Sequence, residues 1–344
     1  MASRWALIRG LDRGRAAIAG FLRRLWRFLT GRARGRWTKG SVRAAGGRLT
    51  YAPWARPWRA YRLYAPGNVD GRTLRPLVVM LHGCTQTPQV FAKGTRMNRL
   101  ADQYGFLTLY PAQRRLANPY RCWNWFDPAV LRGRGEAAIV LTMIREVVAR
   151  HPVDPARIYL VGISAGGALA TVLASCHGST FAACAVHSAV MYRAADSLAE
   201  AARVMQHGSK ASAAATASEA ARVAGDAGAF VPMLVLQGSE DQTVGPVNAD
   251  QIVDQALALH GQFDTGSTLP IAHVADSRIE GGREMRIDDY RLADRAIVRK
   301  VLIDGLAHAW SGGDARQKYY DPAGPDATRM IWEFLSAHRR EVVQ

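Results

Sequence analysis

From about Tyr51 onward, the chain alternates short apolar runs with segments in which apolar residues recur every three or four positions. The apolar runs predict strands at Tyr61–Tyr64, Leu77–Leu81, Phe106–Tyr110, Ile158–Gly162, Ala182–His187, Met233–Gln237 and Ala296–Ile303. The periodic segments predict helices at Ala137–Ala149, Ala165–Ser175, Ala249–Leu259 and Ala327–His338. Strands that alternate with helices are typical of a mostly parallel sheet with helices on both faces, so we expect an α/β fold.

An alanine-rich stretch, Ala194–Ala229, interrupts this alternation. Its residues favour helix, but few of them are large and apolar. We interpret residues 191–230 as a small cap inserted near the functional face of the sheet. A plain connection across the surface is the alternative.

The first 50 residues carry most of the positive charge. They hold 13 of the 45 Lys and Arg residues and a single acid, Asp12, so they account for +12 of the net charge of +17. The charge of the remaining chain is modest. We therefore predict a basic N-terminal extension at residues 1–45 and a globular domain at residues 46–344.

Within the extension, residues 13–29 place apolar side chains on one helix face and Arg23, Arg24 and Arg27 on the other. This pattern predicts a basic amphipathic helix, which can lie on an anionic membrane or granule surface. A helix packed on the domain and a frayed tail are the alternatives. No nucleic-acid-binding fold surrounds the segment, so no nucleic-acid partner is expected. The apolar run Ala16–Leu22 is too short for a standard export signal.

The composition, 49% hydrophobic and 21% charged, is that of a globular protein. No apolar run approaches the roughly 18 residues of a membrane-spanning helix. The four cysteines, Cys84, Cys122, Cys176 and Cys184, form no C-x-x-C pair and lack histidines at zinc-finger spacing. A structural metal is therefore not expected.

A G-x-S-x-G motif, Gly162 to Gly166, lies between the predicted strand that ends at Gly162 and the predicted helix that begins at Ala165. A strand, a sharp turn and a helix around such a serine are typical of the nucleophile elbow of the α/β-hydrolase fold. Glycines flank the serine because a side chain there would collide with neighbouring backbone. We therefore predict this fold, with Ser164 as the nucleophile. A glycine-rich turn with an incidental serine is the alternative.

A serine nucleophile needs a histidine that accepts its proton and a carboxylate that orients the histidine. In this fold, the acid and then the histidine follow the serine along the chain. Asp241 comes directly after a predicted strand and is the expected acid, with Glu240 as the fallback. His308 lies among small residues in a loop after the apolar run 301–303, and it follows the acid in the required order. We predict His308 as the base.

The oxyanion of a tetrahedral intermediate needs preorganised N–H donors. The first is expected to be the amide of Ala165, directly after the nucleophile. The loop after the predicted strand Leu77–Leu81 offers Gly83 and Cys84 for the second. The predicted chemistry is two-step acyl transfer through an acyl-enzyme, which requires no cofactor and no metal.

Five stretches, in order, resemble the polyhydroxybutyrate depolymerase family of esterases, which is related to feruloyl and acetylxylan esterases. They are LHGCTQTP (81–88), CWNWF (122–126), VGISAGGALA (161–170), GSEDQTVGPVNADQ (238–251) and GLAHAWSGG (305–313). The resemblance implies Ser164, Asp241 and His308 as the catalytic triad and Cys84 as an oxyanion donor.

The resemblance also implies an ester substrate, either 3-hydroxyalkanoate oligomers or a feruloyl or acetylxylan ester. It implies an extracellular location, whereas the missing export signal favours a cytoplasmic or granule-associated protein. Secreted polymer-degrading members carry an added substrate-binding domain, which this sequence does not show, so crystalline polymer is not an expected substrate. The rival functions are a degenerate hydrolase that binds a polymer or membrane surface, and thioester or peptide hydrolysis by the same triad.

Trp123, Trp125 and Trp310 lie within these stretches. Flat aromatic rings suit an acyl or aromatic subsite, so we predict that the three tryptophans bind substrate. Burial in the core is the alternative. Cys84 and Cys122 are both expected in loops around the same face, and a disulfide between them is a hypothesis for an oxidising compartment.

Overall fold

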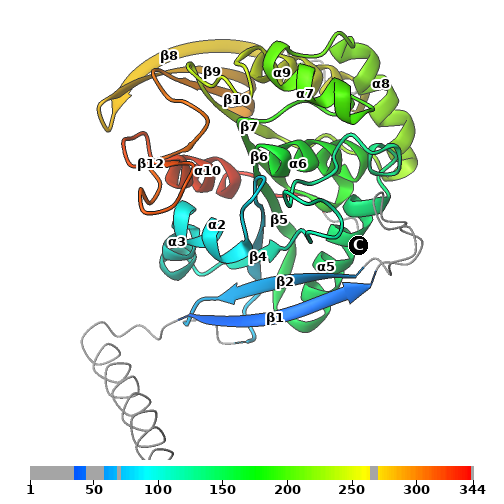
Figure 1. The fold of residues 1–344 in the computed structure, drawn as a ribbon, viewed down its shortest axis with the longest axis vertical. Helices are drawn as coiled ribbons and strands as arrows, with labels where there is room; N and C mark the ends of the chain where they lie inside the picture. The colour runs from blue at the N-terminus through cyan, green and yellow to red at the C-terminus, as the bar shows by residue number, and fades with distance from the viewer. Residues whose placement is uncertain (1–34, 44–57, 68–70, 264–269, 342–344) are drawn as a thin grey trace, which may run out of the picture.

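The centre of the fold is a ten-stranded sheet with the strand order β1-β2-β4-β3-β5-β6-β7-β10-β9-β8 (Figure 1). This computed structural model describes residues 35–43, 58–67, 71–263 and 270–341, and all counts refer to them. The strands of the sheet are β1 (Arg36–Arg43), β2 (Trp58–Ala65), β3 (Arg75–Leu81), β4 (Leu107–Pro111), β5 (Val153–Ile163), β6 (Ala183–His187), β7 (Met233–Gly238), β8 (Ala272–Glu280), β9 (Arg283–Leu292) and β10 (Arg295–Ile303). A second, two-stranded sheet pairs β11 (Trp310–Ser311) with β12 (Tyr320–Asp321).

Six neighbouring strands in the middle of this order run parallel to one another, namely β4, β3, β5, β6, β7 and β10. Antiparallel strands complete both edges, β2 and β1 on one side and β9 and β8 on the other. The predicted mostly parallel sheet is therefore confirmed, and each of the seven predicted strands overlaps an observed one.

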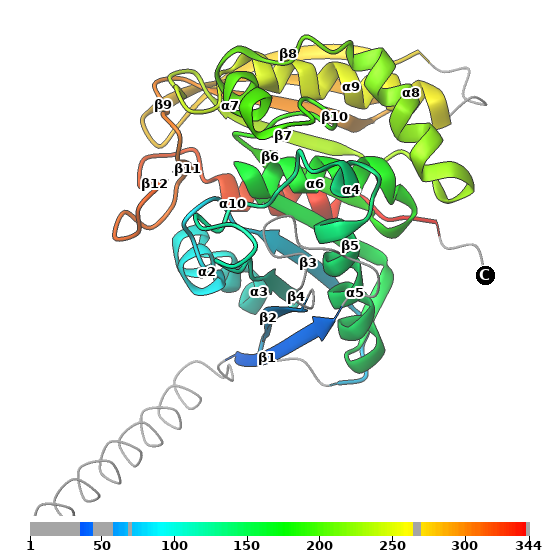
Figure 2. The same ribbon diagram turned by 45° about the vertical axis from the view of Figure 1, so that its right-hand side comes forward.

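Helices cover both faces of the sheet (Figure 2). They are α2 (Pro88–Thr95), α3 (Met97–Tyr104), α4 (Pro128–Leu131), α5 (Gly135–Arg150), α6 (Ala165–Cys176), α7 (Leu198–His207), α8 (Ala213–Ala224), α9 (Val247–Phe263) and α10 (Ala327–Ser336). The four predicted helices correspond to α5, α6, α9 and α10.

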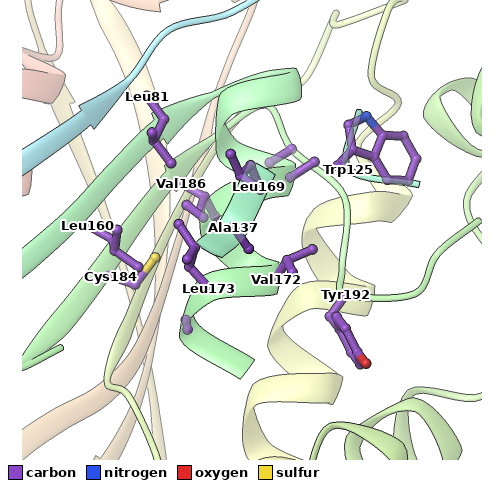
Figure 3. Packing of buried hydrophobic residues seen from close by; sticks show 14 of the residues in the cluster. Leu81, Trp125, Ala137, Leu160, Leu169, Val172, Leu173, Cys184, Val186 and Tyr192 are labelled. Atoms are coloured by element: carbon purple, nitrogen blue, oxygen red, sulfur yellow. The ribbon is translucent and has the colours of Figure 1, made fainter. Parts of the chain in front are cut away.

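Alternation along the central strands divides the core into two layers. In β3, Leu77 and Val79 belong to the core layer that contains α5, α6 and α9, whereas Val78 and Met80 belong to the layer that contains α2, α3 and α10. Successive side chains of a strand point to opposite faces, and a strand covered on both faces is apolar throughout. Figure 3 shows the first layer, where α6 lies against the side chains of β5 and β6.

The sheet begins earlier than the sequence predicts. Arg36–Arg43 forms the edge strand β1, which pairs antiparallel with β2, so the predicted boundary between residues 45 and 46 lies after the start of the folded domain. The strand was not recognised because most of its side chains are exposed. The predicted amphipathic helix at residues 13–29 lies outside the described residues. Within the described part of the chain, no helix is long and apolar enough to cross a membrane.

The segment predicted as a cap, residues 191–230, forms α7 and α8. Helix α8 packs on α6 and α9 through Ala217 and Ala220, both of which are fully buried. Helix α7 lies at the end of β7, where the backbone carbonyl of Met205 accepts hydrogen bonds from Gly245 N and Asn248 Nδ2 at 2.7 and 2.9 Å. These contacts fix α7 beside the loop that carries Asp241.

Candidate active site

Ser164 occupies a tight turn between β5 and α6. Its backbone has φ 55° and ψ −127°, a conformation that costs free energy for any residue with a side chain. A Cβ on Gly162 would lie 2.3 Å from Gly166 O, and a Cβ on Gly166 would lie 2.2 Å from Leu81 O. Both positions therefore require glycine, and the turn has the predicted geometry of a nucleophile elbow.

Asp241 and His308 form a hydrogen-bonded pair. His308 Nδ1 donates to Asp241 Oδ2 at 2.8 Å, and the carboxylate side chain is fully buried. Oδ1 accepts from the amides of Thr243 and Val244 at 2.9 and 2.8 Å. Burial alone would raise the pKa of Asp241, but the hydrogen bond and charge of His308 together with the Val244 amide lower it below its usual value. Glu240, the fallback acid, is exposed.

Two residues that the sequence analysis did not single out extend this pair. The side chain of Ser188 lies beside Asp241 and helps to lower the pKa of its carboxyl, and His187 Nδ1 lies 3.1 Å from Ser188 Oγ. His187 and Ser188 are both fully buried, and no sequence motif points to either of them. The amides of Thr243 and Val244 thus hold the carboxylate in place, and Ser188, directly after β6, adds to the stabilisation of its ionised form.

The loop after β3 presents a free amide beside Ser164. Gly83 N donates to Gln86 Oε1 at 2.9 Å, so this candidate donor is already engaged. In the described residues, neither Cys84 N nor Ala165 N donates a hydrogen bond within the protein. These two amides are the donors that the sequence analysis selected.

Several contacts hold this loop in place. His82 Nδ1 donates to Gly83 O at 2.8 Å, its Nε2 accepts from Gln113 N at 3.2 Å, and its ring is buried. A disulfide joins Cys84 to Cys122, as hypothesised from the sequence. Cross-links that close a chain segment restrict its alternative conformations. The free cysteines, Cys176 and Cys184, are buried away from this loop in the core.

Ser164 and His308 line a single cavity of about 190 Å³. Its other lining residues are Gly83, Cys84, Gln86, Ile163, Met205, Thr243 and Tyr319. Met205 comes from α7, so the predicted cap segment contributes one wall. No motif in the sequence singles out Met205 or Tyr319, because the chain brings them to the cavity from distant segments. The volume is small compared with the roughly 300–1,000 Å³ of ordinary small-molecule sites.

The three tryptophans predicted to bind substrate do not line this cavity, and this prediction is wrong. Trp123 and Trp310 are fully buried, and only 4% of Trp125 is exposed. Trp123 Nε1 donates to His82 O at 3.1 Å, and Trp310 Nε1 donates to Thr328 Oγ1 at 3.0 Å. The indole of Trp123 therefore supports the loop after β3, whereas that of Trp310 binds to helix α10 inside the core.

Two buried histidines are expected to make the fold less stable in mild acid. Burial lowers the pKa of His82 to about 4 and that of His187 to about 3, from the usual 6.5. As the pH falls below the usual value, the unfolded chain binds protons that the folded chain does not. The free energy of unfolding should then fall by about 1.4 kcal/mol per pH unit for each histidine. Denaturant titrations at about pH 7, 6 and 5 measure this slope.

The variant His187→Gln should reduce that slope by about 1 kcal/mol per pH unit, because glutamine does not titrate. Equal free energies of unfolding at all three pH values would contradict the prediction.

The described residues contain no group of three or more His, Cys, Asp or Glu side chains suited to a metal ion. The polar side chains that line the cavity are those of Ser164, His308, Gln86, Thr243 and Tyr319. These groups suit proton transfer and the binding of a developing oxyanion.

Comparison with known proteins identifies the family. The family described as Esterase PHB depolymerase matches residues 59–277. The chain belongs to this family. Poly(3-hydroxyalkanoate) depolymerase C of Paucimonas lemoignei is 35% identical over 188 residues, which are 54% of this chain and 45% of that protein. Feruloyl esterase B of Neurospora crassa is 34% identical over 131 residues, or 38% and 43% of the two chains. The chain thus spans less than half the length of each of these two family relatives.

A solved structure supports the same fold. An acetyl xylan esterase from Aspergillus awamori superposes with a TM-score of 0.66 at 19% identity, over 87% of this chain and 99% of that one. At this identity the similarity concerns the fold alone. Together with membership of the esterase PHB depolymerase family, it confirms the α/β-hydrolase fold and the family resemblance seen in the sequence.

Proposed function

We propose that the protein is a serine esterase that hydrolyses carboxylic esters with Ser164, His308 and Asp241 as its triad. The observation that carries the proposal is the cavity that Ser164 and His308 share, with the buried carboxylate of Asp241 bonded to the far nitrogen of His308. A buried anion at that nitrogen keeps the Nε2 atom free to accept a proton.

The proposed reaction begins when Ser164 Oγ attacks the ester carbonyl while His308 Nε2 accepts its proton. The amides of Cys84 and Ala165 stabilise the oxyanion of the tetrahedral intermediate. Collapse of this intermediate transfers the proton to the departing alcohol and leaves an acyl-enzyme. His308 then deprotonates a water molecule that attacks the acyl group, and the carboxylic acid leaves with Ser164 restored.

We further propose short 3-hydroxyalkanoate oligomers as the substrate, because the poly(3-hydroxyalkanoate) depolymerase relative has the longer alignment and higher identity of the two relatives above. The cavity volume of about 190 Å³ favours a short acyl group over a long chain. Feruloyl and acetyl esters are the competing substrates, since feruloyl esterase B is also a relative.

Hydrolysis of p-nitrophenyl acetate, butyrate and octanoate by the purified chain tests the chemistry. A preference for acetate or butyrate supports the small acyl pocket. Parallel assays with 3-hydroxybutyrate oligomers, a feruloyl ester and acetylated xylan separate the substrate classes. If the protein hydrolysed none of these substrates, the esterase proposal would be overturned. Turnover of feruloyl esters alone would overturn only the proposed substrate.

Ser188→Ala is expected to lower kcat by about tenfold with KM nearly unchanged. The hydroxyl stabilises the ionised Asp241, and a hydrogen bond to a charged group contributes about 1.5–3 kcal/mol, part of which is realised in the transition state. Ser188 does not line the cavity, so substrate binding should persist.

Ser175→Ala is the matched control, because Ser175 is also a buried serine but lies near the end of α6. Equal losses of kcat in the two variants would show that Ser188 acts through general packing and has no special role in holding Asp241.

A further inference from the structure

A second cavity, of about 640 Å³, lies between the β1–β2 edge of the sheet, the α2–α3 pair and the loop before β12. It shares no lining residue with the cavity around Ser164. Its lining residues are Trp37, Arg62, Gln89, Ala92, Lys93, Arg96, Asn98, Arg99, Asp314, Arg316 and Gln317. Five of them are cationic and one is acidic, so the wall carries an excess of positive charge.

The one acid does not neutralise this excess. Asp314 is bound by Arg316, whose Nη2 and Nε donate to the two carboxylate oxygens at 2.6 and 2.9 Å. Arg316 lowers the pKa of Asp314 below its usual value, and the charge of Arg96 adds to this effect. The carboxylate therefore remains ionised and occupied by its own partner.

The other four cations have no carboxylate partner among the described residues. When the side-chain amide of Gln89 turns its oxygen toward Arg62, the guanidinium donates to that oxygen from Nη2 and Nε at 2.8 and 3.0 Å. Arg96 Nη1 donates weakly to Gly312 O at 3.4 Å, and its Nε is buried without a partner. Lys93 and Arg99 are exposed at the cavity. Four positive charges thus meet at one concave surface.

An arginine-rich chain carries solvated cations over much of its surface, and the exposed residues Arg132 and Arg145 outside the cavity also have no carboxylate partner among the described residues. Outside the cavity, Arg222 pairs with Glu219, Arg299 with Asp289, and Arg329 with both Glu280 and Glu333. The cavity differs in that it gathers four unpaired cations, from β2, α2 and the start of α3, on one concave surface. Clustering of like charges costs free energy unless an anion offsets it.

We propose that this cavity binds a small organic molecule that carries two or more phosphate or carboxylate groups. The planar guanidinium groups of Arg62, Arg96 and Arg99 match the oxygen pairs of such groups. Trp37 is 42% exposed at the rim, where its ring can stack on the organic part of the ligand. The cavity volume lies within the range of ordinary small-molecule sites. This proposal does not depend on the esterase function.

Calorimetric titration of the full chain with inorganic tripolyphosphate, and separately with citrate, tests the site. Saturable binding of about one ligand per chain is expected, and it should weaken as salt is raised. The double variant Lys93→Glu/Arg99→Glu should lower the affinity by about tenfold or more, because two attractions become repulsions. The double variant Arg132→Glu/Arg145→Glu makes the same charge change at exposed positions outside the cavity and should bind like the unchanged chain.

Tighter binding of tripolyphosphate than of citrate would assign a phosphorylated ligand, and the reverse order a polycarboxylate. Absence of saturable binding to either probe would overturn the proposal. Equal affinity of the two double variants would also overturn it, because the binding would then belong to other basic segments of the chain. Circular dichroism and the unfolding temperature show whether each variant is folded.

Discussion

Replacing Ser164 with alanine is expected to lower ester turnover by about 10⁴- to 10⁶-fold, with binding of the substrate largely retained. The reason is that alanine at the elbow has no nucleophilic oxygen and cannot form the acyl-enzyme, whereas the oxyanion donors remain. Alanine adopts the same backbone with a similar Cβ, so the free energy of unfolding should change little. The measurement is kcat and KM for p-nitrophenyl butyrate, with mass spectrometry of the trapped acyl-enzyme.

The control for this variant is Ser336→Ala, at the exposed end of α10 and remote from the cavity. It should retain full turnover. A Ser164→Ala protein that is folded and as active as the unchanged chain would contradict the proposed nucleophile. The nucleophile would in that case be a different residue of the cavity.

The elements that carry the predicted chemistry could be located from the sequence because they are buried on both faces. Residues 77–81 of β3, 158–163 of β5 and 233–236 of β7 are buried and almost entirely apolar. The spacing of the elbow glycines is typical of a nucleophile elbow. The position of Ser164 follows from that local pattern. Asp241 follows from its place after β7, because the carboxyl ends of parallel strands meet at one edge of the sheet.

The edges of the sheet could not be predicted in the same way. Strand β8 is exposed along almost its entire length, and its sequence AHVADSRIE mixes polar and apolar residues without a clear period. Its pairing with β9 depends on the turn between them and on backbone hydrogen bonds, which composition does not report. The edge strand β1 was missed for the same reason.

The interpretation of the tryptophans failed because a ring that suits a ligand also suits a core. Nothing local distinguishes Trp123, which faces His82 inside the protein, from a ring that faces solvent. The effect of Ser188 on Asp241 could not be predicted from the sequence either. It joins the end of β6 to the loop after β7, which lie far apart in the sequence but side by side in the sheet.

Asp241→Asn is expected to lower kcat by about 10⁴-fold while leaving KM and the fold nearly unchanged. The backbone amides of Thr243 and Val244 donate to Oδ1, so an asparagine must place its oxygen at that position. Its NH₂ group then faces His308 Nδ1, where Oδ2 now accepts. His308 is forced to accept at Nδ1 and to carry its proton on Nε2, where it cannot take the proton of Ser164.

The neighbouring variant Glu240→Gln is the matched control for this prediction. Its carboxylate is exposed, so kcat should change by no more than about twofold, as is usual for a surface substitution. If Glu240→Gln lost activity and Asp241→Asn kept it, the carboxylate assigned from the position after β7 would be wrong. Because the two residues are adjacent, the contrast depends on side-chain direction alone. Loss of activity in Asp241→Asn alone would establish the buried hydrogen bond to His308, and not mere proximity to the strand end, as the source of the effect.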